Sequence, residues 1–396
     1  MDEDRDVRVG GSGYHRRVSA TVDLSDIPVV DGHCHPLLRD PVDVSIETFL
    51  DLFSEGRPGT MRAHVTHTGY YRRALRALAE RLGVAPTVEG VLDARRRHLG
   101  PDTARAQFAA AGIAALLVDT GYPSEVMPLA EMRRRLGCAV HEVFRIETCA
   151  ERLLAERPSF ADFIAAFRGA LLEAARSCVA FKTIVAYRSG LAVRPWSDEE
   201  CQVSYARALG ALAQGRPRLV DKPLLDRLVE TTLEVARETE RPLQVHAGFG
   251  DPDIDLIGAN PLLLRPILEE PRWAPIPLVL LHMAYPFTRE AAFMTAVWPQ
   301  VHLDLSLALP FLGAGAVAPL IEILSLAPSN KLMYGSDVSA LPELFALSAE
   351  WGRDALGTAL GWLVERDDLD ATAAMEIGRT ILSENARALY ALPPEP

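Results

Sequence analysis

Short apolar runs alternate with longer amphipathic segments along most of the chain. The apolar runs predict eight β-strands, at residues 27–35, 114–120, 139–148, 178–187, 243–248, 277–285, 301–306 and 331–337. The segments between them, such as 161–176, 223–240 and 288–298, repeat their apolar residues at helical spacing. Strands that are apolar throughout and alternate with helices are typical of a parallel sheet buried on both faces.

Polar residues cluster where these strands end. Open sheets of this class usually carry a glycine-rich nucleotide motif after a strand, and neither G-x-G-x-x-G nor G-x-x-x-x-G-K-[ST] follows any of these strands. Closed barrels instead place their active sites at the carboxyl ends of the strands. The residues found there are His33, His35, Asp119, Glu147, His246, His282, Asp304 and Asp337. The pattern therefore predicts an α/β fold, a (β/α)8 TIM barrel.

Two regions exceed a minimal barrel. Residues 41–101 contain helical patterns at 70–83 and 87–100, and a smaller insertion spans about 190–216. Because both follow strands, we expect them to form a helical cap over the active-site face. The Gly-rich start of the chain predicts a flexible arm over residues 1–20, which leaves 21–396 as a single barrel domain.

Composition limits the partners and the compartment. The chain has 396 residues, 49% hydrophobic and 24% charged, with a net charge of −12 and no dense Lys/Arg block. Nucleic acid and membrane surfaces are therefore not expected as partners. The expected partner is a small-molecule substrate. Five scattered cysteines without a C-x-x-C pair, and no apolar leader, indicate a reducing cytoplasm. Barrels of this type often pair, so a homodimer is considered, although no stretch specifies an interface.

The stretch "VDGHCHP" (30–36) suggests a metal. His33 and His35 stand two residues apart on a strand, so their side chains point to the same side, while Cys34 points away into the core. A single histidine such as His246 in an apolar strand is more often a satisfied core residue, and Asp337 could merely cap a helix. Taken together, imidazoles and a carboxylate from separate strands indicate catalytic zinc, with manganese and iron as alternatives.

Longer stretches resemble a known family. These are "FKTIVAYRSGL" (181–191), "PLQVHAGFGDPDIDL" (242–256), "NPLLLRPILEE" (260–270), "LVLLHMAYPFTREAAF" (278–293), "VHLDLS" (301–306) and "KLMYGSDVSALPELF" (331–345). With the H-x-H pair they resemble the amidohydrolase superfamily of metal-dependent TIM-barrel hydrolases. Within it, they are most similar to the amidohydrolase domain of FluG and of nodulin/glutamine-synthetase-like proteins. No function of the glutamine-synthetase-like part of those fusions is carried over.

The resemblance implies roles for the clustered residues. His33, His35 and His246 would bind the metal, and Asp337 would be a further ligand or the base that deprotonates the attacking water. His282 would bind a second metal or sit beside the first, orienting the water and stabilising the oxyanion. One ion is favoured over two.

Five more residues have open roles. Lys182 is either carboxylated and bridging, as in two-metal members, or part of an ordinary ion pair, which is the favoured interpretation. Arg188 could clamp a substrate carboxylate or form a surface ion pair, and Tyr187 could contact substrate or be buried. Asp251 or Asp253 could pair with a substrate amine, although runs of this kind also build turns.

The leading functional expectation is metal-dependent hydrolysis of a C–N bond. The resemblance implies the amide of a small carboxylate-bearing molecule, with a γ-glutamyl-type amide as the specific expectation. The alternative is non-oxidative decarboxylation, which related one-metal members perform. A non-catalytic binding barrel is a third hypothesis, and the intact set of metal-binding side chains argues against it.

Overall fold

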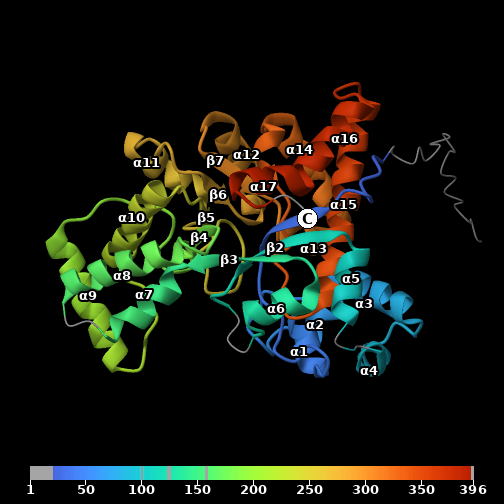
Figure 1. Cartoon of the computed structure of the whole chain (residues 1–396), viewed down its shortest axis with the longest axis horizontal. Helices are drawn as coiled ribbons and strands as arrows, with labels where there is room; N and C mark the ends of the chain where they lie inside the picture. The colour runs from blue at the N-terminus through green and yellow to red at the C-terminus, as the bar shows by residue number, and fades with distance from the viewer. Residues whose placement is uncertain (1–20, 99, 101, 123–125, 157–158, 394–396) are drawn as a thin grey trace, which may run out of the picture.

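The computed structural model describes residues 21–98, 100, 102–122, 126–156 and 159–393. Eight parallel strands follow one another around a single sheet in the order β1 to β8 (Figure 1). They are β1 (Val29–Cys34), β2 (Ile113–Asp119), β3 (Ala139–Arg145), β4 (Ala180–Thr183), β5 (Leu243–Val245), β6 (Leu278–Leu280), β7 (Val301–Asp304) and β8 (Leu332–Met333). The eight predicted strands are all present.

Backbone hydrogen bonds connect the first strand to the segment that follows the last one. Gly32 N–H donates to the carbonyl of Tyr334 (2.9 Å), and Asp337 N–H donates to the carbonyl of His33 (2.8 Å). His35 N–H continues the series with Val338 (2.8 Å). These bonds bring the two edges of the sheet together, so the predicted (β/α)8 barrel is confirmed.

Several strands end earlier than the apolar runs predicted. β3 gives way to helix at Ile146, and β4 stops at Thr183, before a 3-10 turn at Val185–Tyr187. After β6 the chain enters a second 3-10 turn, His282–Ala284. The predictions 139–148, 178–187 and 277–285 were too long because apolar residues continue into a helix after β3 and into 3-10 turns after β4 and β6. Catalytic candidates beyond β5, β6 and β8 therefore lie on loops.

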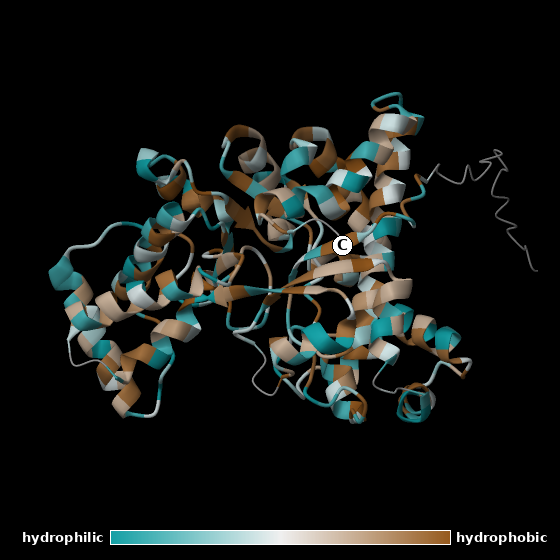
Figure 2. Cartoon of the chain, viewed as in Figure 1, coloured by the Kyte–Doolittle hydropathy of each residue, from teal (hydrophilic) through white to brown (hydrophobic). Residues whose placement is uncertain are grey.

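Helices surround the barrel, and polar residues gather on their outer faces (Figures 1 and 2). They are α1 (Ile46–Asp51), α2 (Arg62–Val65), α3 (Gly69–Leu82), α4 (Val88–His98), α5 (Thr103–Ala110), α6 (Leu129–Leu136), α7 (Ile146–Leu154), α8 (Phe160–Ala174), α9 (Asp198–Ala213), α10 (Lys222–Thr239), α11 (Arg265–Leu268), α12 (Thr288–Val297), α13 (Ala308–Leu312), α14 (Val317–Leu326), α15 (Pro342–Glu365), α16 (Ala371–Arg379) and α17 (Asn385–Leu389).

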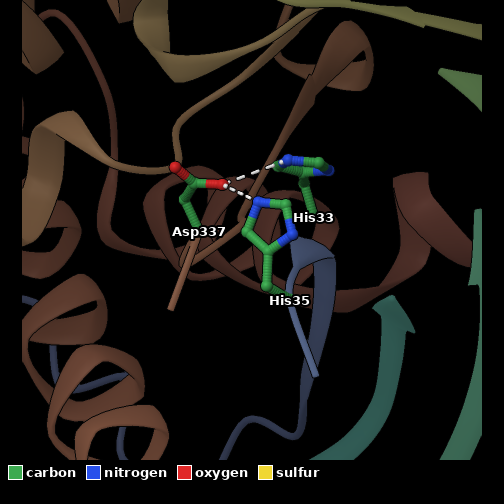
Figure 3. Close-up of side chains that lie close together, drawn as sticks. All are labelled: His33, His35 and Asp337. Atoms are coloured by element: carbon green, nitrogen blue, oxygen red, sulfur yellow. Dashed lines mark ion pairs between the residues drawn. The ribbon is translucent and has the colours of Figure 1, made fainter. Parts of the chain in front are cut away.

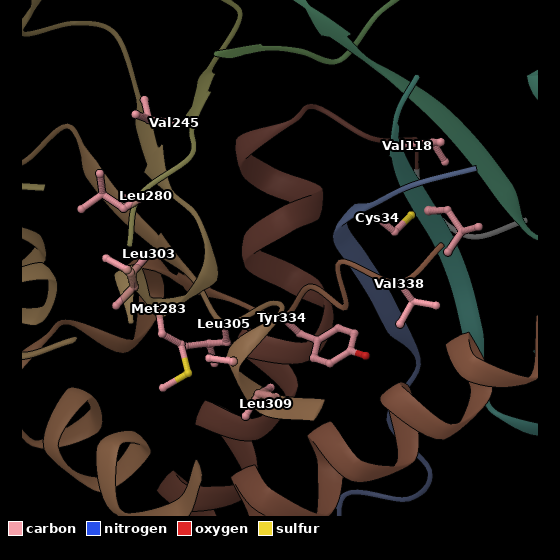
Figure 4. Packing of buried hydrophobic residues seen from close by; sticks show 14 of the residues in the cluster. Cys34, Val118, Val245, Leu280, Met283, Leu303, Leu305, Leu309, Tyr334 and Val338 are labelled. Carbon is pink, nitrogen blue, oxygen red and sulfur yellow. The ribbon is translucent and has the colours of Figure 1, made fainter. Parts of the chain in front are cut away.

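The apolar side chains form two cores. The larger core lies between strands and helices, and includes Cys34, Val118, Leu303 and Tyr334 (Figure 4). Cys34 is fully buried there, as predicted, with Sγ against the carbonyl of Leu117 (3.4 Å). The smaller core joins strand residues to the C-terminal segment; its members are Val30, Ala115, Leu117, Val143, Val179, Ala180, Val279, Leu281, Met333, Ala386, Tyr390 and Leu392.

The insertion at 41–101 is helical, as predicted, and forms α1 to α4. α3 begins at its N-cap Thr68 and ends at Gly83, which adopts a left-handed conformation. Tyr70 packs against Phe311, with ring centroids 4.8 Å apart. In the smaller insertion, α9 packs on α8 and α10 and thus joins the outer layer of helices. The first insertion approaches the carboxyl end of the barrel, where Arg57 forms an ion pair with Asp253, beyond β5 (3.1 Å), and Glu55 lies near Asp337 and Asp251.

Two further segments of the sequence have an unusual composition. The predicted arm at 1–20 lies outside the described residues. Ala308–Leu326 is long and apolar enough to cross a membrane by length and composition alone. This segment is divided into α13 and α14 by a 3-10 turn, and α14 packs against α12 and α15 of the barrel. Its apolar residues therefore serve the helical layer.

Candidate metal centre

Three predicted ligands meet at the carboxyl end of the barrel. His33 lies in β1, His35 follows it, and Asp337 lies beyond β8 (Figure 3). The Nε2 atoms of His33 and His35 lie 3.1 and 3.3 Å from Asp337 Oδ1. One ligand atom from each residue falls within 4.8 Å of the others. These three residues form a compact candidate metal-binding group.

Several loop residues of the site have left-handed backbone conformations, which set the direction of their side chains. Asp337 has φ of 59°, and His282, Met283 and Ala284 have φ of 65°, 54° and 46°. Side chains at positive φ cost energy, and such residues concentrate at functional sites, where the surrounding packing holds them. Gly248 (φ 78°) helps to hold this run, because a Cβ there would collide with the backbone of Ala284. The rim is thus built around a rigid left-handed segment.

Gln244 in β5 determines which nitrogen of His33 carries the proton. Its Nε2 donates to the carbonyl of Gly32 (2.8 Å) and to the hydroxyl of Tyr390 (2.9 Å), so its Oε1 remains an acceptor. His33 Nδ1 lies 2.9 Å from that oxygen and therefore donates to it. In a neutral imidazole the other nitrogen, Nε2, then bears a lone pair.

His35 has the same arrangement with a backbone acceptor. Its Nδ1 lies 3.1 Å from the carbonyl oxygen of Asp119, so Nδ1 donates, and in a neutral imidazole Nε2 then bears the lone pair. Two lone pairs therefore face Asp337 Oδ1, an oxygen without a hydrogen-bond partner in the described part of the chain. A cation at this point would turn three repelling atoms into three ligands, so the side chains fit a divalent metal.

His246 and His282 extend the site. Their rings lie 4.4 Å apart, and His246 Nδ1 is 2.9 Å from His282 Nε2. His246 is not part of the compact three-residue group, but its Nε2 is buried without a hydrogen-bond partner among the described residues. Gly250 leaves space beside this atom, since a Cβ there would lie 3.2 Å from it. His246 thus keeps one nitrogen for an external partner.

Burial makes the centre suited to neutral imidazoles. It lowers the pKa of His33 to about 4, with Lys182 contributing, and lowers the pKa of His246 and His282 well below the usual value. Burial alone would raise the pKa of the Asp337 carboxyl, whereas positive charge on the neighbouring imidazoles, His282 foremost, and hydrogen bonds from His33 and His35 would hold it well below its usual range. Neutral imidazoles beside a carboxylate are the protonation states that metal binding requires.

Lys182 lies in the floor of the centre. Its Nζ is 3.0 Å from His33 Nε2 and 3.5 Å from Asp119 Oδ2. Asp119 also receives a bidentate ion pair from Arg145, with Nη2 at 2.6 Å. Burial lowers the pKa of Lys182, and Asp119 opposes that shift. The ion pair of the favoured interpretation is thus present, and carboxylation of Lys182 stays a prediction.

The expected substrate residues are only partly free. Asp253 forms ion pairs with Arg57 (3.1 Å) and Arg218 (2.5 Å), so it ties the first insertion to the loop after β5. Arg188 Nη2 lies 3.3 Å from Glu151, although its Nε is buried without a partner among the described residues. The expected amine role of Asp253 is therefore not supported, because both carboxylate oxygens are already paired.

Tyr187 and Asp251 lie nearer the candidate centre. The ring of Tyr187 is 4.4 Å from that of His246, and its hydroxyl accepts the backbone N–H of Asp251 (3.3 Å). Burial raises the pKa of Tyr187 well above its usual value, so the hydroxyl stays protonated and can donate. The Asp251 carboxylate accepts the N–H of Asp253 in a turn (3.0 Å) and is exposed. Both remain candidates for substrate contact.

The sequence did not single out Gln244 and Ser306. Gln244 stands two residues before His246 in "LQVHAG", and Ser306 stands two residues after Asp304 in "VHLDLS". The sequence feature that could have identified them is a polar residue two positions from a candidate ligand, because side chains two apart in a strand point to the same side. Glu147 was expected at a strand end but lies in α7, where it accepts from Thr183 Oγ1 (2.6 Å) and holds the end of β4.

Comparison with known proteins agrees with this geometry. A model of the amidohydrolase family matches residues 30–392. The chain is 30% identical over 402 residues to the protein FluG of Emericella nidulans, in an alignment that covers 93% of the chain and 46% of FluG. It thus spans about half the length of that curated relative.

Solved structures share the fold. A protein assigned as a metal-dependent hydrolase from Lactobacillus casei has a TM-score of 0.82 at 27% identity, covering 94% of this chain and 98% of that one. A uronate isomerase from Thermotoga maritima has a TM-score of 0.67 at 14% identity, with 92% and 95% covered, which shows likeness of fold alone. The family match over nearly the whole described barrel shows that this chain belongs to the amidohydrolase family.

Proposed function

We propose that this protein is a metal-dependent hydrolase that cleaves a C–N bond, the amide of a small carboxylate-bearing molecule. The observation that carries the proposal is the convergence of His33 Nε2 and His35 Nε2 on Asp337 Oδ1, at 3.1 and 3.3 Å, with no hydrogen-bond partner for that oxygen among the described residues. His33, His35, His246 and Asp337 would hold the ion, and zinc suits imidazole and carboxylate ligands, with manganese and iron as alternatives.

A divalent ion bound there would lower the pKa of a water molecule and polarise the substrate carbonyl. Asp337 is placed for the proton transfers, because its Oδ1 has no hydrogen-bond partner among the described residues and its Oδ2 lies 3.8 Å from His282 Nδ1. It would accept a proton from the attacking water and deliver it to the leaving amine. Tyr187, whose hydroxyl stays protonated beside His246, is placed to donate to the substrate.

We take a γ-glutamyl-type amide as the substrate, following the resemblance to FluG, with which the chain is 30% identical. Such a molecule carries an ammonium group and a carboxylate. Of the two aspartates expected to contact a substrate amine, Asp251 is the one left for the ammonium group, because Asp253 is paired with two arginines. The buried Nε of Arg188 is the donor left for the carboxylate.

The first prediction concerns Asp337. Asp337→Asn keeps the shape of the side chain but cannot take up the proton of water, so we expect turnover to fall by at least about 100-fold, the lower bound of general acid–base catalysis. Circular dichroism should show an unchanged fold. The assay measures ammonia or amine released from glutamine and γ-glutamyl anilides by zinc-loaded protein. Asp370→Asn, at the N-cap of α16, is the control and should leave the rate unchanged.

The products separate this proposal from its alternative. Release of carbon dioxide without amine would replace hydrolysis by decarboxylation. Near wild-type turnover of Asp337→Asn would refute its role as the proton shuttle. Purified protein that neither contains nor takes up a divalent ion would exclude both reactions and favour a non-catalytic barrel.

A further inference from the structure

A carboxylate at the end of β7 receives two backbone N–H groups on one oxygen. His282 N–H and Ser306 N–H point at Asp304 Oδ1, at 3.3 and 3.0 Å. An oxygen that accepts two N–H groups carries no proton of its own, whether or not the carboxyl group is charged. Asp304 Oδ2 is buried and has no hydrogen-bond partner among the residues described. Asp304 Oδ1 is therefore a fixed acceptor.

Asp304 Oδ1 determines whether the Ser306 hydroxyl donates or accepts. Ser306 Oγ is hydrogen-bonded to the same Asp304 Oδ1, and since this oxygen only accepts, the hydroxyl must donate. The single proton of Ser306 is then used, and Oγ can offer only lone pairs to another group. His282 Nδ1 lies 2.9 Å from Oγ, so His282 must donate from Nδ1.

The direction of the next hydrogen bonds, through the imidazoles of His282 and His246, follows in the same way. With its proton on Nδ1, neutral His282 bears a lone pair on Nε2, and His246 Nδ1 lies 2.9 Å from it. His246 must therefore also donate from Nδ1, which leaves its buried Nε2 as a lone pair without a partner among the described residues. Every hydrogen bond from Asp304 to His246 thus has a single permitted direction.

We propose that Asp304 and Ser306 are positioning residues that act through His282 to hold His246 with its Nε2 lone pair free for the metal. His282 itself binds no ion, because one ring nitrogen donates to Ser306 and the other accepts from His246. The centre therefore takes one metal ion. This inference rests on the metal centre of the proposed function, and it assigns His282 a supporting role in place of a second metal site.

Metal affinity tests the proposal without any assay of turnover. Ser306→Ala removes the acceptor of His282 Nδ1, so both imidazoles can reverse, and loss of such an outer partner typically weakens metal binding by about 10- to 100-fold. We expect this loss for Co²⁺ and Zn²⁺ in competition with a chromophoric chelator, with one ion per chain in wild type. Ser348→Ala, which alters another buried serine that accepts from Tyr334 (3.1 Å), should bind like wild type.

A second variant separates the effect of hydrogen-bond direction from the effect of the negative charge of Asp304. Asp304→Asn keeps a carbonyl oxygen facing the two N–H groups, so the direction of the chain survives, and we expect metal binding close to that of wild type. If Asp304→Asn weakens binding as much as Ser306→Ala, the carboxylate charge is what matters and the proposal is overturned. Undiminished affinity of Ser306→Ala, or two ions per chain, would overturn it as well.

Nitrogen NMR of histidine-labelled, metal-free protein reads the protonation directly. We expect the proton on Nδ1 of His246 and His282, and Ser306→Ala should change these two residues while His33 and His35 keep theirs. A proton on Nε2 of His246 or His282 in wild type would overturn the proposal. If metal binding and protonation behave as expected but no amide is cleaved, the proposed reaction fails and this inference stands. If wild type binds no divalent ion, both fail.

Discussion

Single acceptor atoms determine which ring nitrogen of each histidine in the candidate metal centre carries the proton. Gln244 Oε1, the carbonyl of Asp119 and Ser306 Oγ each accept an imidazole N–H, from His33, His35 and His282. Each acceptor leaves its histidine with one defined lone pair. The sequence predicted the histidines, because they follow apolar strands, but these partners come from other strands and could not be paired with them in advance.

A prediction at this scale concerns Lys182. Its ammonium donates to His33 Nε2 (3.0 Å), the atom that would bind the ion, and its positive charge repels a cation. Lys182→Met keeps most of the side-chain volume, so we expect one ion per chain to remain and the affinity for Zn²⁺ to stay equal or rise. Metal analysis with chelator competition measures both.

The contrary outcome has a clear meaning. If Lys182 is carboxylated and bridges two ions, wild type should contain nearly two ions and Lys182→Met fewer. Arg133→Met is a matched control, because Arg133 donates to the carbonyl of Val140 on the outer side of β3, away from the centre.

At the scale of elements, strand ends and insertions differ in how well sequence predicts them. Apolar runs located the eight strands but not their ends, since Val185–Tyr187 and His282–Ala284 are as apolar as strands and form 3-10 turns. Helical spacing predicted α3 and α4 in the first insertion. The second insertion was expected to cap the pocket; its helix α9 packs on α8 and α10, and the cap stays a prediction. Contacts between elements are not encoded in local periodicity.

The first insertion carries a buried titratable group, Glu55, from which a third prediction follows. Burial, with nearby Asp337 and Asp251, raises the pKa of Glu55 from 4.5 to about 8. Between these values the native protein keeps a proton that the unfolded chain has released, so the free energy of unfolding should fall as pH rises from about 4.5 to 8. Glu55→Gln lacks this term, and relative to wild type it should gain stability over that range, by at most about 1.4 kcal/mol per pH unit.

Urea unfolding of metal-free protein at several pH values measures this difference. Glu89→Gln, in α4 of the same insertion, is the control, because Glu89 is exposed and its variant should follow the wild-type curve. Parallel curves for Glu55→Gln and wild type would show that Glu55 ionises normally in the native state.

At the scale of the whole molecule, the C-terminal segment completes the barrel. Tyr390 and Ala386 pack with strand residues such as Val30 and Leu117 in the smaller core. The Tyr390 hydroxyl accepts from Gln244 Nε2 (2.9 Å), the residue that also orients His33. Tyr390, directly after α17, is therefore connected to the candidate metal centre through the side-chain amide of Gln244.

Removing the Tyr390 hydroxyl gives the fourth prediction. Tyr390→Phe leaves one N–H of Gln244 without its buried acceptor, which should lower the free energy of unfolding by about 1–3 kcal/mol. Urea denaturation measures the change. Tyr71→Phe should have a smaller effect, since the described residues offer no hydrogen bond to its hydroxyl. Equal stability of Tyr390→Phe and wild type would mean that water replaces the lost acceptor.

The sequence by itself determined the barrel and the residues that converge in it. Alternating apolar runs and helices require a parallel sheet covered on both sides, and residues at the carboxyl ends of such strands must share one rim. His33, His35 and Asp337 meet there for that reason. Only the tertiary structure decided which nitrogen faces the centre, that Asp253 is paired with Arg57 and Arg218, and that His282 is held between Ser306 and His246. These outcomes depend on hydrogen bonds between residues far apart in the chain, whose geometry exists only once the barrel has closed.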